Sequence, residues 1–134
     1  MRSGVRLASI ERMPVRVLIV DDNRGFLEAA RVLLEREGLS VVGVASSADE
    51  AIRQDQKLRP EVALVDITLG AESGFELARR LRENDRNGRL TVILVSTHAE
   101  ADFAELIAGS PANGFLPKSE LSAEAVRRIL DRRP

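Results

Sequence analysis

The chain has 134 residues, a length typical of one domain with its own buried core. Its 20 basic and 21 acidic residues nearly cancel, so no bulk basic field indicates a nucleic-acid partner. It has no cysteine, which excludes disulfides and thiolate metal sites, and no apolar run approaches the roughly 20 residues that span a bilayer. We therefore expect a cytoplasmic domain without a membrane segment and without direct nucleic-acid binding.

The chain divides into three parts by pattern. Residues 1–13 show no clear periodicity and precede Pro14, so we predict a mobile N-terminal extension. Residues 14–131 carry regular alternation of strand and helix patterns, and we predict that they form the folded domain. Residues 132–134 are expected to be a short tail.

Five apolar, mostly β-branched runs alternate with five amphipathic helical patterns. Such alternation predicts an α/β fold, a doubly wound parallel sheet of five strands with helices on both faces. The predicted strands are 15–20, 40–45, 61–66, 90–96 and 114–117. The predicted helices run from Arg24 to before Gly38, from the cap Ser47 to about Leu58, from Phe75, after Ser73 and Gly74, to before the Asn87–Gly88 turn, and over 99–108 and 123–131. Their inward faces are predicted as Phe26, Ala30, Leu33 and Leu34, then Ala48, Ala51 and Ile52, then Phe75, Ala78 and Leu81, and finally Val126, Ile129 and Leu130.

Polar residues follow four of these strands at their C-terminal ends. They are Asp21 and Asp22, then Asp66, then Ser96 and Thr97, and finally Lys118. In a parallel sheet these ends share one edge, which is where ligands bind in open α/β folds. Three carboxylates there would repel one another and raise at least one pKa unless a cation lies between them.

The types of group at this edge suit phosphate chemistry. Carboxylate oxygens without nitrogen or sulfur ligands favour Mg²⁺. An ammonium, a hydroxyl and a carboxylate nucleophile beside such a cation suit a phosphoryl group, whose charge must be neutralised during transfer. Each residue alone has an ordinary interpretation: Asp21–Asp22–Asn23 as a turn and cap, Lys118 as a surface lysine. Their conjunction at four strand ends favours a site.

The motifs LIVDDN at 18–23, ALVDITLG at 63–70, VILVST at 92–97 and GFLPKSEL at 114–121 together resemble the receiver domains of two-component response regulators. This resemblance covers about residues 15–131. It implies a flavodoxin-like fold with strand order 2-1-3-4-5. The ending KSEL resembles receivers that precede LuxR/NarL-type output domains.

The resemblance also implies roles for individual residues. Asp66 would be the phosphoacceptor, and Mg²⁺ would be held by Asp22 directly, by Asp21 mainly through water, by Asp66 and by the backbone carbonyl of Thr68. Lys118 would pair with a phosphoryl oxygen. Ser96 would be the switch hydroxyl, with Phe115 turning inward beside it. The donor would be a sensor histidine kinase, a phosphotransfer protein or a small phosphodonor, and the domain would catalyse its own phosphorylation and dephosphorylation.

Three positions depart from the pattern of the family. Gly70 replaces a common proline, which predicts a more flexible acceptor loop. Thr97 replaces a small residue, and its bulk is expected to slow phosphotransfer or hydrolysis. Ser119 replaces the common proline after the lysine, so no cis Lys–Pro bond is expected.

Two other functions remain open from the sequence. An aspartyl-phosphate phosphohydrolase would use similar chemistry, although Thr68 stands where such enzymes commonly place a second acid. A constitutive interaction module with a vestigial site is the other alternative. If the receiver interpretation holds, the face formed by the helix at 99–108, the strand at 114–117 and the helix at 123–131 is expected to switch, and homodimers would form through it.

Overall fold

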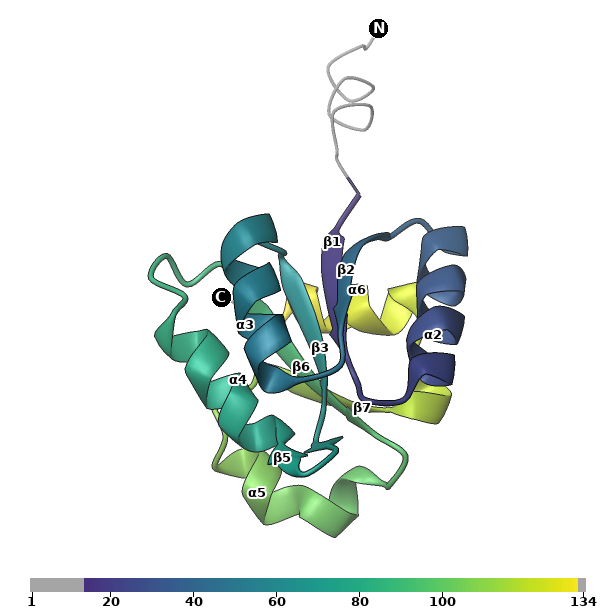
Figure 1. The fold of residues 1–134 in the computed structure, drawn as a ribbon. Coiled ribbons are helices and arrows are strands. Elements are labelled where there is room, and N and C mark those ends of the chain that lie inside the picture. Colours follow the sequence, from purple (N-terminus) through teal and green to yellow (C-terminus); the bar gives the residue numbers. More distant parts are fainter. Residues whose placement is uncertain (1–13, 133–134) are drawn as a thin grey trace, which may run out of the picture.

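The computed structural model describes residues 14–132, which form one five-stranded parallel sheet (Figure 1). Its strands lie in the order β2-β1-β3-β6-β7. Their bounds are β1 Arg16–Val20, β2 Ser40–Ala45, β3 Val62–Asp66, β6 Thr91–Ser96 and β7 Gly114–Pro117. This order is the one expected from the family resemblance, and the strand positions agree with the predictions to within about a residue.

Helices cover both faces of the sheet (Figure 1). One face packs against α2 (Arg24–Arg36) and α6 (Ala123–Asp131), and the other packs against α3 (Ala48–Leu58), α4 (Gly74–Glu83) and α5 (Ala104–Ala108). Both faces of β1, β3 and β6 are therefore buried, which explains why these strands are continuous apolar runs. The polar residues Asp66 and Ser96 are the last residues of β3 and β6.

Side-chain caps set where the longer helices begin. Asn23, Ser47, Ser73 and Ser122 each accept a hydrogen bond from a backbone N–H three residues later. The cap predicted at Ser47 is therefore confirmed. These caps place the helix starts directly after the loops at the carboxyl edge of the sheet.

The buried faces of the helices differ from the predictions in part. In α2 the buried residues are Leu27, Ala30 and Leu34, while Phe26 is only half-buried because it lies at the carboxyl edge. In α4, Leu77 is fully buried and Phe75 only partly. Ile52 and Leu130 are also partly exposed.

The helix predicted over 99–108 is less regular than expected. Its first part is a 3-10 helix, η1 (Glu100–Phe103), and only the last five residues form α5. None of its residues is buried, so few packing contacts enforce α-helical geometry there. A second 3-10 turn, η2 (Lys118–Glu120), follows β7.

The loop after β3 forms a small hairpin that the sequence did not predict. Strands β4 (Thr68–Leu69) and β5 (Glu72–Ser73) pair antiparallel around a turn at Gly70. Gly70 has φ +60°, which is outside the range that proline can adopt. The glycine therefore permits this turn, and greater flexibility of the loop stays a prediction.

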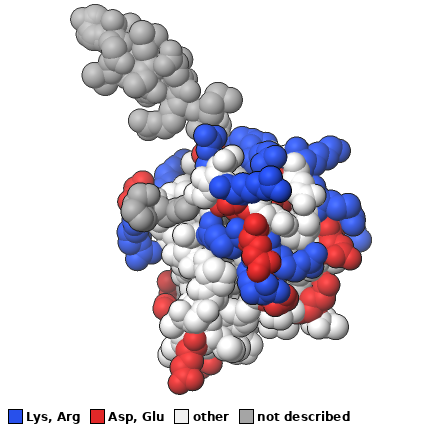
Figure 2. Space-filling view, turned by 90° about the vertical axis from the view of Figure 1, so that its left-hand side faces the viewer, with Lys and Arg blue, Asp and Glu red and all other residues white. Residues whose placement is uncertain are grey.

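The outward faces of α3 and α4 carry many charges of both signs (Figure 2). Arg79 forms ion pairs with Glu76 and Glu83, and Arg80 lies 3.7 Å from Asp49. These pairs are exposed, so each contributes little to stability. No helix between residues 14 and 132 is long and apolar enough to cross a bilayer. The predicted extension at 1–13 and most of the predicted tail lie outside the described residues.

Candidate functional site

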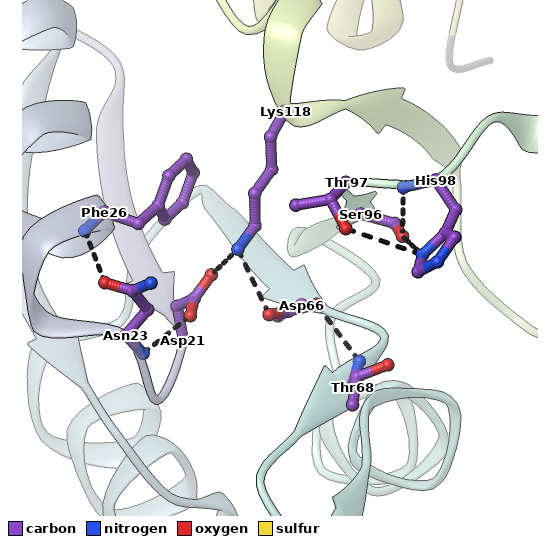
Figure 3. A network of polar contacts seen from close by, with 9 residues as sticks. All are labelled: Asp21, Asn23, Phe26, Asp66, Thr68, Ser96, Thr97, His98 and Lys118. Atoms are coloured by element: carbon purple, nitrogen blue, oxygen red, sulfur yellow. Dashed lines mark hydrogen bonds and ion pairs between the residues drawn. The ribbon is translucent and has the colours of Figure 1, made fainter.

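A pocket of about 250 Å³ opens at the carboxyl edge of the sheet. Its lining comes from the loops that follow β1, β3, β6 and β7 (Figure 3). It gathers seven of the residues predicted for the site, namely Asp21, Asp22, Asp66, Thr68, Ser96, Thr97 and Lys118, and adds Asn23 and His98. The convergence predicted from the strand ends is therefore present in the structure.

Asp66 ends the central strand β3 and is only 7% exposed. Its Oδ1 accepts a hydrogen bond from the backbone N–H of Thr68 (3.0 Å). Burial raises the pKa of Asp66, and repulsion from Asp21 adds to this, while the Thr68 N–H and the charge of Lys118 act in the opposite direction. The result is a partly shielded carboxylate that faces an open pocket.

Asp21 and Asp22 follow β1 and differ in exposure. Asp21 is fully buried, whereas Asp22 is exposed. The Oδ1 of Asp21 accepts the backbone N–H of Asn23 (2.8 Å), and Asn23 in turn caps α2 through the N–H of Phe26 (3.0 Å). The same turn thus orients the acid and starts the helix.

Lys118 lies between the two buried carboxylates (Figure 3). Its Nζ is 2.6 Å from Asp21 Oδ2 and 3.3 Å from Asp66 Oδ2. Burial alone would lower the pKa of Lys118, but Asp21 and Asp66 outweigh it and hold that pKa above its ordinary value. The lysine therefore stays charged and partly neutralises the acidic cluster.

Ser96 ends β6 and is 2% exposed. Its Oγ accepts the backbone N–H of His98 (3.0 Å), and the Nδ1 of His98 lies 3.5 Å from the hydroxyls of both Ser96 and Thr97. Thr97 itself is exposed at the mouth of the pocket. In this arrangement the Ser96 hydroxyl is engaged by its own loop.

Phe115 is the one predicted site residue that does not line the pocket. It lies in β7, half-buried, and packs against the core cluster beneath α4 and α5. Its register neighbour in the sheet is Leu94 of β6. Ser96 pairs with Pro117, so Phe115 lies two residues along β7 from the partner of Ser96.

Gly74, at the start of α4, packs directly against the backbone of the acceptor strand. A Cβ at this position would lie 2.0 Å from the carbonyl oxygen of Asp66 and 2.6 Å from the Cα of Ile67. Its N–H donates to the carbonyl of Ile67 (2.9 Å). The start of α4 therefore fixes where the acceptor loop leaves the sheet.

The donor set suits a hard divalent cation. Asp21, Asp22 and Asp66 each offer a carboxylate oxygen, and these oxygens lie within 4.8 Å of one another. Asp21 Oδ2 is fully buried, and the ammonium of Lys118 lies 2.6 Å from it. Carboxylate oxygens grouped in this way are the ligands that a hard divalent cation takes.

Sequence reasoning missed two contributors. The ring of Phe26 lies 4.2 Å from Lys118 Nζ, and the backbone N–H of His98 donates to Ser96 Oγ. Phe26 fitted the apolar stripe predicted for its helix, so nothing in the sequence distinguished it from a core residue. The turn and cap considered for Asp21–Asp22–Asn23 are present, because the N–H of Asn23 donates to Asp21 and its side chain caps α2.

Comparison with known proteins points to one family. The profile described as "Response regulator receiver domain" matches residues 17–130. Response regulator GacA of Pseudomonas viridiflava is 31% identical over 116 residues, covering 86% of this chain and 53% of that protein. The nitrate/nitrite response regulator protein NarL of Escherichia coli is 31% identical over 106 residues, covering 78% of this chain and 48% of the relative.

A solved structure agrees with these sequence matches. The receiver domain protein (CheY-like) from Methanospirillum hungatei superposes with a TM-score of 0.74 at 26% identity, covering 90% of this chain and 94% of that one. The chain spans about half the length of the curated relatives that it matches.

Proposed function

Because the chain belongs to the response regulator receiver domains, the phosphoacceptor domains of two-component signalling, we propose that Asp66 is its phosphoacceptor. The single observation that carries this assignment is the placement of Asp66, 3.3 Å from Lys118 and in one acidic cluster with Asp21 and Asp22. Asp21 shares the burial, the pocket and the contact with Lys118, and Asp66 differs from it in ending the central strand β3 within the motif ALVDITLG at 63–70.

The proposed reaction is a phosphoryl transfer to Asp66. A carboxylate oxygen of Asp66 forms a bond to phosphorus, while the bond from phosphorus to the imidazole nitrogen of a phosphohistidine breaks and the nitrogen keeps the electron pair. The Thr68 N–H orients the Asp66 carboxylate through Oδ1, so the Oδ2 atom that faces Lys118 is the nucleophile in this proposal. Lys118 then pairs with an oxygen of the transferred group.

The divalent cation in this proposal is Mg²⁺, held by Asp22, Asp66 and the backbone carbonyl of Thr68, with Asp21 acting mainly through water. When bound, it supplies positive charge that neutralises the phosphoryl oxygens during transfer. The cluster of three carboxylate oxygens supports this assignment. The same groups would also promote hydrolysis of the phosphoryl group, which makes both reactions properties of the domain itself.

The switch is proposed to begin at Ser96. Its hydroxyl would leave the His98 N–H and donate to the phosphoryl group, and Phe115 would turn inward as the loop moves. The affected face consists of η1 and α5, β7 and α6. Thr97, exposed at the mouth of the pocket, would limit access to the phosphoryl group and slow these reactions.

The partners follow from the family. Receiver domains take phosphoryl groups from histidine kinases or phosphotransfer proteins, and we propose the same for this chain, together with homodimerisation through the switching face. Leu106 of α5 is 57% exposed on that face, which supports an apolar contact there. A cytoplasmic location is part of the same proposal.

The test is the formation of a beryllofluoride adduct and of acyl phosphate from acetyl phosphate, both in Mg²⁺. We expect the wild-type chain to form both, observed by ¹⁹F NMR and by mass spectrometry. Asp66→Asn should form neither, because its amide is not a nucleophile. Asp85→Asn, which changes an acid at the opposite edge of the sheet, is the matched control and should react like wild type.

Retention of either adduct in Asp66→Asn would contradict the assignment. Multiple-turnover hydrolysis of an organic phosphate by the wild-type chain would favour a phosphohydrolase instead. Absence of both adducts in wild type would favour a vestigial site.

A further inference from the structure

The ring of Phe26 lies beside the ammonium group of Lys118 (Figure 3). Lys118 Nζ stands 4.2 Å from the centroid of the ring. Phe26 belongs to the first turn of α2, whereas Lys118 follows β7, so the contact joins distant parts of the chain. A cation held over an aromatic face is attracted by the quadrupole of the ring.

The position of this ring is tied to that of Asp21. The side chain of Asn23 accepts the N–H of Phe26 (3.0 Å), and the backbone N–H of Asn23 donates to Asp21 Oδ1 (2.8 Å). The ring is also half-buried against the core beneath α2. Phe26 therefore has little freedom to move independently of the acid.

The ammonium is not shared equally between its two carboxylates. It lies 2.6 Å from Asp21 Oδ2 but 3.3 Å from Asp66 Oδ2, and Figure 3 shows Phe26 and Asp21 on one side of it and Asp66 on the other. The ring and the fully buried acid thus hold Lys118 from the same side.

We propose that Phe26 is a positioning residue that holds Lys118 against Asp21, so that the lysine competes with a divalent cation for the acidic cluster. The inference rests on the proposed function, because it concerns the metal site described there. Each contact that stabilises the ammonium beside Asp21 weakens metal binding by at most the same factor, since the two positive charges neutralise the same carboxylates. Loss of the ring therefore strengthens metal binding.

The size of the effect follows from the strength of a cation–π contact. Such contacts contribute enough to change a binding equilibrium by about three- to tenfold at partly buried sites. Phe26→Leu, which keeps an apolar side chain but removes the ring, should bind Mg²⁺ about three- to tenfold more tightly. Phe26→Tyr keeps the ring and should bind it within about twofold of wild type.

The experiment is isothermal titration of the full chain with Mg²⁺ in the absence of any phosphodonor. Thermal unfolding of each variant, measured without metal, checks that the fold is intact. Phe26→Trp adds a second measurement, because the chain has no tryptophan and the new indole would report directly on the departure of the ammonium. Tryptophan attracts cations more strongly than phenylalanine, so this variant should bind Mg²⁺ more weakly than wild type.

The decisive control removes the charge of Lys118. In a Lys118→Met background, Phe26→Leu should leave the Mg²⁺ affinity unchanged, because no ammonium remains to be held. An equal effect of Phe26→Leu in both backgrounds, or no effect in wild type, would overturn the role of the ring while leaving the metal site standing. A wild-type chain that binds no Mg²⁺ at millimolar concentration would overturn the metal site and this inference together.

Discussion

Each of the two edges of the sheet carries a pocket lined by acids, and the proposed phosphoryl site lies in the smaller pocket. At the amino edge, the loops before β3 and β6 line a pocket of about 740 Å³, whereas the pocket at the carboxyl edge measures about 250 Å³. At the amino edge, Asp85 accepts hydrogen bonds from the backbone N–H groups of Arg89 and Leu90 and from the guanidinium of Arg82. At the carboxyl edge, the close partner of the buried Asp21 Oδ2 is the ammonium of Lys118, 2.6 Å away.

This difference separates Asp85, a carboxylate that stabilises a turn, from Asp21, a carboxylate of the proposed site. Asp85 closes the turn between α4 and β6, and its three donors satisfy it within the chain. Asp21 has one backbone donor and the ammonium of Lys118 as its counter-charge. A carboxylate that is neutralised by one side-chain ammonium can also be neutralised by a bound cation.

Removal of Lys118 should have the largest effect on stability. Lys118→Ala leaves Asp21 buried without its counter-charge, and we expect a loss of about 3 kcal/mol in the free energy of unfolding. Urea unfolding without metal measures it, and Mg²⁺ should reduce the loss by supplying charge to the same carboxylates. Arg79→Ala, which removes only exposed ion pairs, should change stability by less than about 0.5 kcal/mol. A loss under about 1 kcal/mol for Lys118→Ala would mean that the pair is not an important counter-charge.

Removal of Asp85 should cost stability without changing the chemistry. Asp85→Ala leaves two backbone N–H groups and one guanidinium without their acceptor, for a loss of about 2 kcal/mol. Beryllofluoride binding at saturating Mg²⁺ should equal that of wild type, because the pocket at the opposite edge is intact. A variant that unfolds normally yet loses the adduct would contradict the separation of the two edges.

Asp55 sharpens the comparison, because it is a second acid in the pocket at the amino edge. It is 9% exposed. Burial raises the pKa of Asp55, repulsion from Asp85 adds to this, and Arg59 acts in the opposite direction. A raised native pKa means that the native state binds the proton more tightly than the unfolded chain. The unfolding free energy therefore falls as pH rises through the interval between the ordinary and the raised pKa.

Asp55→Asn should accordingly stabilise the chain near neutral pH, by about 1 kcal/mol. The gain should disappear below about pH 3.5, where the carboxyl is protonated in both states. Unfolding curves across this pH range measure the difference, with the exposed Asp49→Asn as the control. A gain that is independent of pH would show that the charge of Asp55 is not its cause.

Much of this molecule could be predicted from its sequence, and the reasons lie in particular residues. The run at 62–66 indicates a strand buried on both faces, and the cap at Ser47 and the turn at Asn87–Gly88 lie where local chemistry places them. The grouping of Asp21, Asp66, Ser96 and Lys118 follows from parallel topology alone. What could not be predicted depends on contacts between distant segments: the ring of Phe26 over Lys118, the engagement of Ser96 by His98, and the half-buried state of Phe115.

The hairpin at 68–73 has a consequence for consensus design, in which the most frequent residue of a family is introduced at each position. Its turn needs the positive φ of Gly70, and its second strand carries Glu72, whose carboxylate accepts the N–H of Ala48 at the start of α3 (2.9 Å). A redesign that restores the proline common in the family would open the hairpin and release α3 from the acceptor loop, although each change would look conservative in an alignment. Proline is the wrong choice at this position, because its fixed φ of about −65° cannot supply the φ of +60° that the turn requires.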